Sequence, residues 1–281
     1  MPESQTIPQT PLEAKSPFEL RVNLGTHVPE TDVRSALASG DLGFLHSFTT
    51  GSTVDGPGVR VVAWTSGCMW RCLYCHNPDT WTITNGIPVA VTKAVEELRK
   101  YRHGLKVMSG GFTLSGGEPL MQDRFAARLF DAVHAMGVHT ALDTNGFYGS
   151  RLSDAELRTI DLVLLDIKTW DSERHKRLTG MDNSATLEFA RRLAALSRPV
   201  WLRYVLVPGL TDDPDDIRKT AAFAASLGNM SRVDVLPFHQ MGRYKWERLG
   251  LSYQLPEVEP PSHEAVERAC SLFRAAGLTA Y

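Results

Sequence analysis

Apolar runs rich in β-branched residues alternate with stretches of helical period from His46 to the C-terminus, and this alternation constrains the fold more than any other feature. Runs typical of strands cover residues 59–66, 112–115, 138–143, 161–167, 200–207 and 232–238. Helical patterns lie near 90–102, 121–136, 184–196, 214–227 and 262–276, with a shorter one at 153–158. About six β-α units predict an α/β protein with parallel strands and outer helices, either an open doubly wound sheet or an incomplete barrel.

Polar and glycine-rich motifs follow the carboxyl ends of all the predicted strands. In chain order they are Cys68–Cys75, Ser115–Pro119, Asp143–Gly146, Asp166–Lys168, Arg203–Gly209 and Leu236–His239. In parallel barrels and open α/β sheets, ligands bind at this edge because the loops after the strands converge there. The sequence therefore predicts one site built from all of these loops.

Three of the four cysteines fall within eight residues, as Cys68, Cys72 and Cys75. Soft thiolates at the spacing Cys-x3-Cys-x2-Cys favour a [4Fe-4S] cluster, and three protein ligands leave one iron free for an external ligand. A structural zinc site is the main alternative, with Cys68 and His76 completing the Cys72 and Cys75 pair.

The fourth cysteine, Cys270, belongs to a different pattern. It recurs at helical spacing with Val266, Ala269 and Phe273, which puts its thiol on an apolar helix face. We therefore expect Cys270 to be a buried core residue that does not bind iron.

Composition and charge exclude several classes of protein. The chain has 30 basic and 32 acidic side chains, a net charge of -2, and no Lys/Arg run that could follow a phosphate backbone, so we expect no nucleic-acid partner. No signal sequence and no apolar segment of about 20 residues is evident, which predicts a cytoplasmic protein without a membrane span. In that reducing compartment, clustered thiols favour metal binding or catalysis over disulfides.

The organisation of domains is simple. Residues 1–42 are rich in proline and polar residues and predict a poorly ordered N-terminal extension, with a short packed arm around Phe18, Leu20 and Val22 as the alternative. Residues 43–281 form the predicted catalytic domain.

Two sets of motifs resemble a known family. The cysteine spacing, with Tyr74 directly before the last thiol and Gly116-Gly117-Glu118 after the next strand, resembles the radical S-adenosylmethionine (SAM) superfamily. A narrower similarity runs from His46 to Tyr281 and is to the pyruvate formate-lyase activating enzymes. It is carried by Asp55–Arg60, Cys68–Trp81, Ser115–Pro119, Asp143–Phe147, Arg203–Gly209, Leu236–His239, and Gly242–Trp246 followed by Leu249, Gly250 and Tyr253.

The resemblance implies a fold and an activity. The expected fold is a partial (β/α)6 barrel that holds a [4Fe-4S] cluster on Cys68, Cys72 and Cys75, with SAM on the open iron. Reductive cleavage of SAM there gives a 5'-deoxyadenosyl radical, which abstracts a glycine hydrogen from pyruvate formate-lyase. The alternatives are another radical SAM enzyme, acting on a different glycyl-radical enzyme or a small molecule, and a metal-binding module without enzymatic activity.

Residues 76–115 contain no further cysteine, so a second cluster cannot be built there. Many other activating enzymes of glycyl-radical enzymes carry a ferredoxin-like cysteine block in this region, and its absence favours the pyruvate formate-lyase type. We expect an external flavodoxin or ferredoxin to deliver the electron, because no second cluster can relay it.

The resemblance also implies contacts to SAM. The residues expected to make these contacts are Tyr74, Cys75, His76, Gly116, Gly117, Glu118, Asp166, Ile167, Lys168 and His239. Glycine allows close approach of the backbone to a ligand, and Asp166 and Lys168 point to the same face of a strand. The simpler alternatives are an ordinary Gly-Gly-Glu turn, a surface ion pair between Asp166 and Lys168, and a structural role for His239.

Two further groups of polar residues are candidates. Asp143 and Thr144 offer oxygen ligands for a hard cation, and the resemblance implies a monovalent cation there; a turn-capping Asp-Thr-Asn-Gly is the alternative. Asp55, Arg60 and Arg203 are candidates for gripping the backbone of the protein partner, or are ordinary loop charges.

Overall fold

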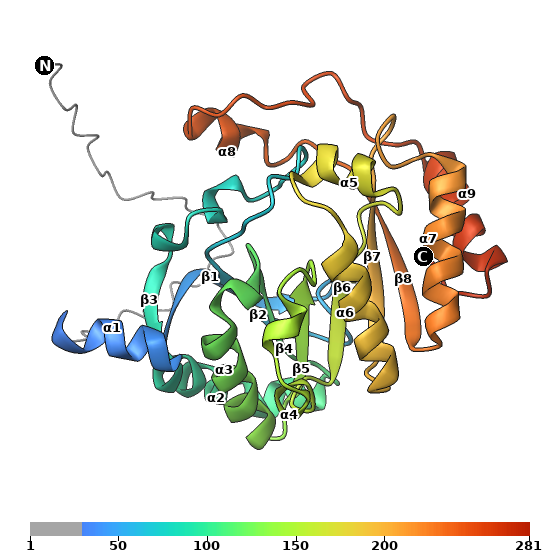
Figure 1. Cartoon of the computed structure of the whole chain (residues 1–281). Helices are drawn as coiled ribbons and strands as arrows, with labels where there is room; N and C mark the ends of the chain where they lie inside the picture. The colour runs from blue at the N-terminus through green and yellow to red at the C-terminus, as the bar shows by residue number, and fades with distance from the viewer. Residues whose placement is uncertain (1–29) are drawn as a thin grey trace, which may run out of the picture.

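A computed structural model describes residues 30–281, and their side chains from residue 33 onward. Eight strands form one sheet in the order β3-β1-β2-β4-β5-β6-β7-β8, which curls with helices on its outer surface (Figure 1). The parallel strands are β2 (Arg60–Thr65), β4 (Gly111–Gly116), β5 (His139–Thr144), β6 (Leu162–Asp166), β7 (Val200–Leu206) and β8 (Met230–Pro237). These coincide with the six predicted strands, and the partial barrel is confirmed.

Two antiparallel strands were not predicted. β1 (Leu42–Ser52) pairs with β2 on one side and with β3 (Ile87–Ala90) on the other, and so extends the sheet beyond the parallel strands. β1 mixes glycine, serine, threonine and histidine with its apolar residues, and β3 has only four residues. Neither segment has a clear alternation of apolar and polar residues, so periodicity alone could not find them.

The predicted N-terminal extension falls largely outside the described residues. Residues 1–29 are not described, and so the proposed arm around Phe18, Leu20 and Val22 lies beyond the structure. Within residues 30–42 the chain forms helix α1 (Glu30–Ser39) and enters β1 at Leu42. The sheet therefore starts one residue before the predicted boundary of the catalytic domain.

Helices cover the outer face of the sheet (Figure 1). They are α2 (Val91–Val107), α3 (Asp123–Ala135), α4 (Asp154–Leu157), α6 (Ser184–Ala195), α7 (Pro214–Leu227) and α9 (His263–Ala275). Two short helices, α5 (Ser172–Thr179) and α8 (Arg243–Arg248), lie instead above the barrel, at the end where the parallel strands end (Figure 1). Short 3-10 turns are η1 (Pro78–Thr80), η2 (Ile83–Asn85), η3 (Pro119–Gln122) and η4 (Gly149–Arg151). α5 and α8 were not predicted because both are short and at least half of the residues in each are charged.

Alternation along the parallel strands separates the core from the interior of the barrel. One face of β5, β6 and β7 enters the main hydrophobic core, through residues such as Leu142, Leu165 and Tyr204. Residues of the opposite face form a small apolar cluster, made of Ala141, Leu162, Leu164 and Trp201. Two residues further along each strand, this interior face becomes charged, with Asp143, Asp166 and Arg203. The barrel is therefore apolar toward its amino end and polar where the strands end.

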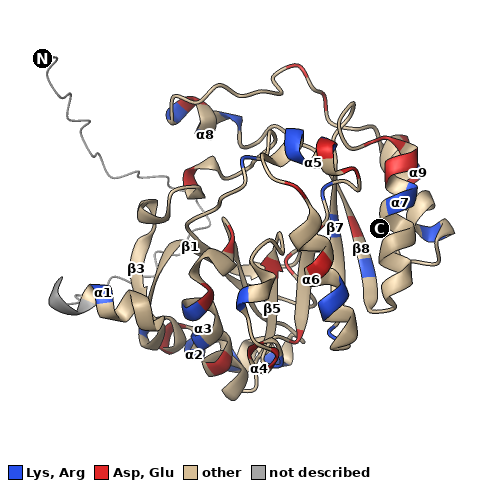
Figure 2. Cartoon of the chain, viewed as in Figure 1, with Lys and Arg blue, Asp and Glu red and all other residues tan. Residues whose placement is uncertain are grey.

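The barrel is open, since β3 and β8 end the sheet without pairing with each other within residues 30–281. The free edge of β8 is covered by the C-terminus, where Ala280 pairs with Val233. Lys and Arg are interspersed with Asp and Glu over the outer helices (Figure 2). In the same part of the chain, no helix has both the length and the apolar character that crossing a membrane requires.

Candidate active site

The three cysteines of the predicted cluster line one cavity of about 270 Å³ at the carboxyl ends of the parallel strands. They lie on the cluster loop, residues 66–77 between β2 and η1. Its start is fixed by two backbone hydrogen bonds, because Gly67 N donates to Thr80 O at 2.7 Å and Cys68 N donates to Trp81 O at 3.1 Å. The predicted convergence of these thiols on one site is observed.

Helix α5 holds the middle of the cluster loop. Arg71 N donates to Thr179 O at 2.7 Å, and Leu73 N donates to Leu178 O at 3.0 Å. The Arg71 guanidinium donates to the carbonyl of Cys68 at 2.7 Å, within the loop itself. The backbone that carries the thiols is therefore fixed by protein contacts.

Burial disfavours the ionised form of all three thiols. Burial raises the pKa of Cys72 to about 12, with Lys168 opposing the shift and Cys75 adding to it. Burial also raises the pKa values of Cys68 and Cys75. No three His, Cys, Asp or Glu side chains within residues 30–281 lie close enough together to hold a single metal ion, and the three thiols line a wider cavity. Since ligand thiols must be deprotonated, bound iron has to supply the charge that stabilises them.

Gly116 and Gly117 form the facing wall of the cavity. Gly116 has φ +122°, and a Cβ atom there would lie 2.2 Å from Thr65 N. A Cβ atom on Gly117 would lie 2.4 Å from Gly67 O, in the cluster loop. Only glycine allows the end of β4 to approach the cluster loop this closely.

Glu118 connects three segments around the cavity. Its carboxylate is fully buried and accepts hydrogen bonds from Leu120 N at 2.9 Å, Thr144 Oγ1 at 2.7 Å and Asn145 N at 2.8 Å. Its own N–H donates to Gly67 O at 2.7 Å. Burial raises the pKa of Glu118 to about 7, although these hydrogen bonds favour the ionised form. Glu118 is thus placed as a buttress behind the cavity, and not on its wall.

Asp166 and Lys168 form a buried ion pair, with 2.8 Å between Oδ2 and Nζ. Both side chains line the cavity, so this is not the surface pair considered as the alternative. The Ile167 side chain, between them, is buried in the main core, and only its backbone is available to the site. Burial opposes the charge of Lys168, but Asp166, Cys72 and Asp143 together outweigh it and raise the pKa of Lys168.

Asp143 and Thr144 point in opposite directions from the end of β5. Asp143 lines the cavity, and its Oδ2 accepts hydrogen bonds from Ser115 Oγ at 2.6 Å and from Arg203 Nη1 at 2.9 Å. The Thr144 hydroxyl donates to Glu118 and accepts from Gly146 N at 2.9 Å. The Thr144 hydroxyl is therefore committed to the turn although Thr144 also lines the cavity, and the Asp143 carboxylate lies on the cavity wall.

The three candidates for partner binding occupy different places. Arg203 lines the cavity, and Asp55 is buried beneath it, 3.5 Å from Arg203 Nη2. Arg60 is fully buried at the amino end of β2, where it donates to Thr113 Oγ1 at 3.0 Å and to Phe112 O at 2.6 Å. This position is out of reach of a partner at the mouth, so Arg60 belongs to the structural framework.

Aromatic and histidine side chains complete the wall. The rings of His76 and His239 meet edge to face, with 5.0 Å between their centroids, and both residues line the cavity. Tyr74 also lines it, and its buried hydroxyl has no hydrogen-bond partner among the described residues. Such an orphaned polar atom indicates a missing ligand group.

Comparison with known proteins now adds to this geometry. Residues 62–224 match the Radical SAM superfamily. The chain is 46% identical over 235 residues to pyruvate formate-lyase-activating enzymes of Staphylococcus epidermidis and Staphylococcus aureus, covering 81% of this chain and 93% of theirs. The chain belongs to the pyruvate formate-lyase-activating enzyme family of the radical SAM superfamily.

Solved structures agree with this assignment. A domain of pyruvate-formate lyase-activating enzyme from Bacteroides vulgatus is 27% identical with a TM-score of 0.52, covering 61% of this chain and 98% of that domain. Spore photoproduct lyase, at 12% identity and a TM-score of 0.62 over 84% of this chain and 78% of its own, shares the fold.

Members of this superfamily use a [4Fe-4S] cluster and SAM, so the family assignment decides against the zinc module. The residues present fit both groups. Three thiols share one cavity, two glycines open its facing wall, and a buried ion pair and an orphaned tyrosine hydroxyl supply polar contacts. This family member is therefore a radical SAM enzyme.

Sequence reasoning missed several residues of the cavity. They include Trp70, Trp81, Ser115, Asn145 and Phe238. Ser115 and Asn145 lie inside the motifs Ser115–Pro119 and Asp143–Gly146, but these motifs did not indicate their individual roles. The signal for the tryptophans was their presence in and directly after the cysteine motif. Cys270 is buried in the main core, as predicted.

Proposed function

We propose that this enzyme generates a glycyl radical in pyruvate formate-lyase, in the cytoplasm. The strongest support is the 46% identity over 93% of relatives that carry this activity in their names. When bound, the cluster and SAM supply a 5'-deoxyadenosyl radical that abstracts the glycine hydrogen. The protein binds SAM, orients it toward the glycine and excludes water from the site.

The contacts to SAM follow from the side chains on the cavity wall. We assign the backbone of Gly116 and Gly117 to the methionine amino group, with Glu118 holding this loop from behind. Lys168 and Asp166 are placed to bind ribose or methionine oxygens. Tyr74, His76 and His239 surround the adenine or the entering substrate loop.

Asp143 is the group we propose for holding a monovalent cation close to the carboxylate of SAM. Its Oδ2 atom is already bonded to Ser115 and Arg203, and its position on the cavity wall leaves it beside the polar end of the barrel. Thr144 contributes by fixing the turn through Glu118.

A protein substrate suits the mouth of this barrel. Immediately after His239 on the cavity wall, Met241 and Tyr244 are 65% and 50% exposed. Large exposed apolar side chains beside a cavity favour a protein partner. Arg203, held by Asp55 and Asp143, is the charged group we propose to meet the entering glycine loop.

The electron must reach the cluster from outside. Beyond Cys68, Cys72 and Cys75, the chain has only Cys270, which is buried in the core, so no second cluster can relay an electron. We propose flavodoxin or ferredoxin as the donor.

Anaerobic incubation of the reconstituted enzyme with pyruvate formate-lyase, SAM and a low-potential reductant tests the function. The expected result is a glycyl-radical doublet on the lyase by electron paramagnetic resonance (EPR), with 5'-deoxyadenosine formed in proportion. Cleavage of SAM without any radical on the lyase would mean that another substrate is the true one.

A further inference from the structure

The last of the three cysteines is bonded to a segment from far along the chain. We call residues 239–253 the C-terminal strap, which includes α8 and lies above the barrel (Figure 1). Trp246 on this strap is 5% exposed, and its indole Nε1 donates to the carbonyl oxygen of Cys75 at 2.9 Å. The strap therefore holds the backbone of Cys75 directly.

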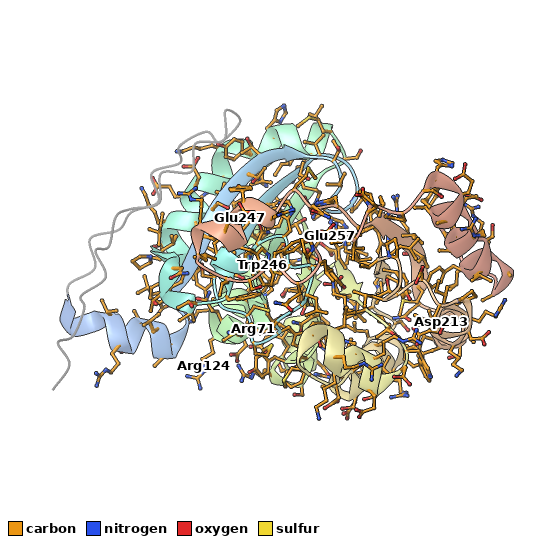
Figure 3. The ribbon with its side chains drawn as sticks, turned by 90° about the horizontal axis from the view of Figure 1, so that it is seen from above. Arg71, Arg124, Asp213, Trp246, Glu247 and Glu257 are labelled. Atoms are coloured by element: carbon orange, nitrogen blue, oxygen red, sulfur yellow. The ribbon has the colours of Figure 1, made fainter. Side chains whose placement is uncertain are left out.

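Trp246 is itself fixed by two aromatic neighbours. Its ring meets that of Trp81 edge to face, with 5.1 Å between centroids, and that of Tyr253 at 5.4 Å. In the view from above, Trp246 lies near the centre of the molecule, whereas Asp213 lies at the periphery (Figure 3). The two neighbouring rings fix the indole and, with it, the direction of its N–H.

Lys245 adds a second contact between the strap and the cluster loop. Its Nζ atom lies 2.8 Å from Asn77 Oδ1, in the loop, and 3.1 Å from Asp79 Oδ2, in η1. Asp79 in turn lies 3.0 Å from the Nε2 atom of His46 on β1. The strap is therefore connected through this network to the sheet as well as to the loop.

Gly242 brings the strap against the backbone of His76. A Cβ atom on Gly242 would lie 2.6 Å from His76 O, which is closer than a real side chain approaches, so only glycine fits here. His239, the first residue of the strap, places its ring 5.0 Å from that of His76. The residue after Cys75 is thus in direct contact with the strap too.

Different elements hold different parts of the cluster loop. Helix α5 bonds the backbone of Arg71 and Leu73 in the middle of the loop, and the strap bonds Cys75 at its end. Groups behind metal ligands orient them, and their loss typically lowers metal affinity by about 10–100-fold. A fixed backbone keeps a thiolate beside its iron, so that a ligand that dissociates rebinds before the iron leaves.

We propose that the C-terminal strap is a clamp for the last cluster ligand, and that Trp246 is the positioning residue through which it acts. The inference rests on the proposed role of Cys75 as a ligand. It gives a function to the Gly242–Trp246 motif, which lies far from the cysteines in sequence. Met241 and Tyr244, which we propose to meet the protein partner, belong to the same segment that holds the cluster.

The test is the rate at which an iron chelator removes iron from the anaerobically reconstituted Trp246→Phe enzyme, followed by the loss of iron-sulfur absorbance. Phenylalanine keeps a ring for Trp81 and Tyr253 but has no N–H. We expect iron loss to be about tenfold faster than in the wild type. Gly242→Ala, which pushes the strap away from His76 O without removing a hydrogen-bonding side chain, should change the rate in the same direction.

The matched control is Thr140→Val, at the amino end of β5. Its buried hydroxyl donates to Thr159 O at 2.7 Å, so valine also removes a side-chain hydrogen bond to a backbone carbonyl while keeping the shape. Urea unfolding should show a loss of stability in this variant, but its iron should leave at the wild-type rate. Equal acceleration in Thr140→Val would mean that any loss of stability releases iron, and would overturn the proposal.

Iron loss from Trp246→Phe at the wild-type rate would also overturn it. Should Trp246→Phe take up no cluster, Gly242→Ala decides, and a rate equal to that of the wild type refutes the clamp. Cys75→Ala in the same assay reports on the ligand itself. A full cluster in Cys75→Ala would refute the proposed ligand set, whereas loss of iron there with wild-type behaviour in Trp246→Phe would refute the clamp alone.

Discussion

Arg203 Nη1 on β7 lies 2.9 Å from Asp143 Oδ2 on β5, although β6 separates these two strands in the sheet. The ion pair therefore crosses the interior of the barrel. Asp55, from the hairpin between β1 and β2, approaches the same guanidinium from below at 3.5 Å. Burial disfavours the charge on Arg203, but Asp143 and Asp55 outweigh it and raise the pKa of Arg203.

Arg203→Met should destabilise the protein strongly. The substitution leaves the carboxylates of Asp143 and Asp55 without their cation, and these two side chains are only 13% and 8% exposed. Removing one partner of a buried pair costs about 3–5 kcal/mol. Urea unfolding measures this, and Arg243→Met, in the exposed pair with Glu247, should cost at most about 1 kcal/mol. Equal losses in the two variants would contradict the account of the interior network.

Glu118→Gln should change how stability depends on pH. Because burial raises the folded-state pKa of Glu118 from 4.5 to about 7, the native state holds a proton that the unfolded state has released between these values. The contribution of Glu118 to stability is therefore present at low pH and is lost as pH rises toward 7. The free energy of unfolding of Glu118→Gln, relative to wild type, should rise by about 3 kcal/mol across this window. A constant difference between the two proteins from pH 4.5 to 7 would show that the carboxyl is not perturbed.

Gly117→Ala should weaken SAM binding and disturb the cluster loop. The added Cβ atom would lie 2.4 Å from Gly67 O, and this backbone contact cannot move without displacing the start of the loop. Iron content and SAM affinity measure the effect. Gly228→Ala, at φ +71° with nothing within 4 Å of the added Cβ atom, should cost about 1 kcal/mol of stability and leave SAM affinity intact.

Alanine at Cys68, Cys72 or Cys75 should abolish the iron-sulfur absorbance after anaerobic reconstitution, since each supplies one of three thiolates. Cys270→Ala should retain it, because Cys270 is 2% exposed within the main core. The loss in stability of this control should be about 1 kcal/mol, from the small volume removed. Full iron content in Cys72→Ala would require a different ligand set.

The parts of the fold that follow from local pattern could be predicted from sequence. Each parallel strand is a buried apolar run followed by a polar motif, so strand positions and the edge that carries the site were both evident. α5 was not predicted because half of its eight residues are charged, and only His175, Leu178 and Thr179 are buried. Its importance comes from backbone hydrogen bonds to the cluster loop, which have no sequence signature.

The residues of the site also divide into those that the sequence could place and those that it could not. Residues within a motif, such as Gly117 or Lys168, could be placed at the cavity because each motif directly follows a strand. Arg60 lies in a motif too, yet the structure buries it among backbone carbonyls at the other end of β2. Trp246 could not be connected to Cys75 in advance, since 170 intervening residues separate them and only the closed fold brings them to 2.9 Å.

The function proposed for this enzyme requires three thiolates to hold a cluster whose fourth iron is open to SAM. The most direct measurement is the EPR spectrum of the reduced, reconstituted protein before and after SAM is added. We expect the cluster signal to change shape when SAM binds, and Cys68→Ala to give no such signal. A cluster spectrum that is identical with and without SAM would contradict it.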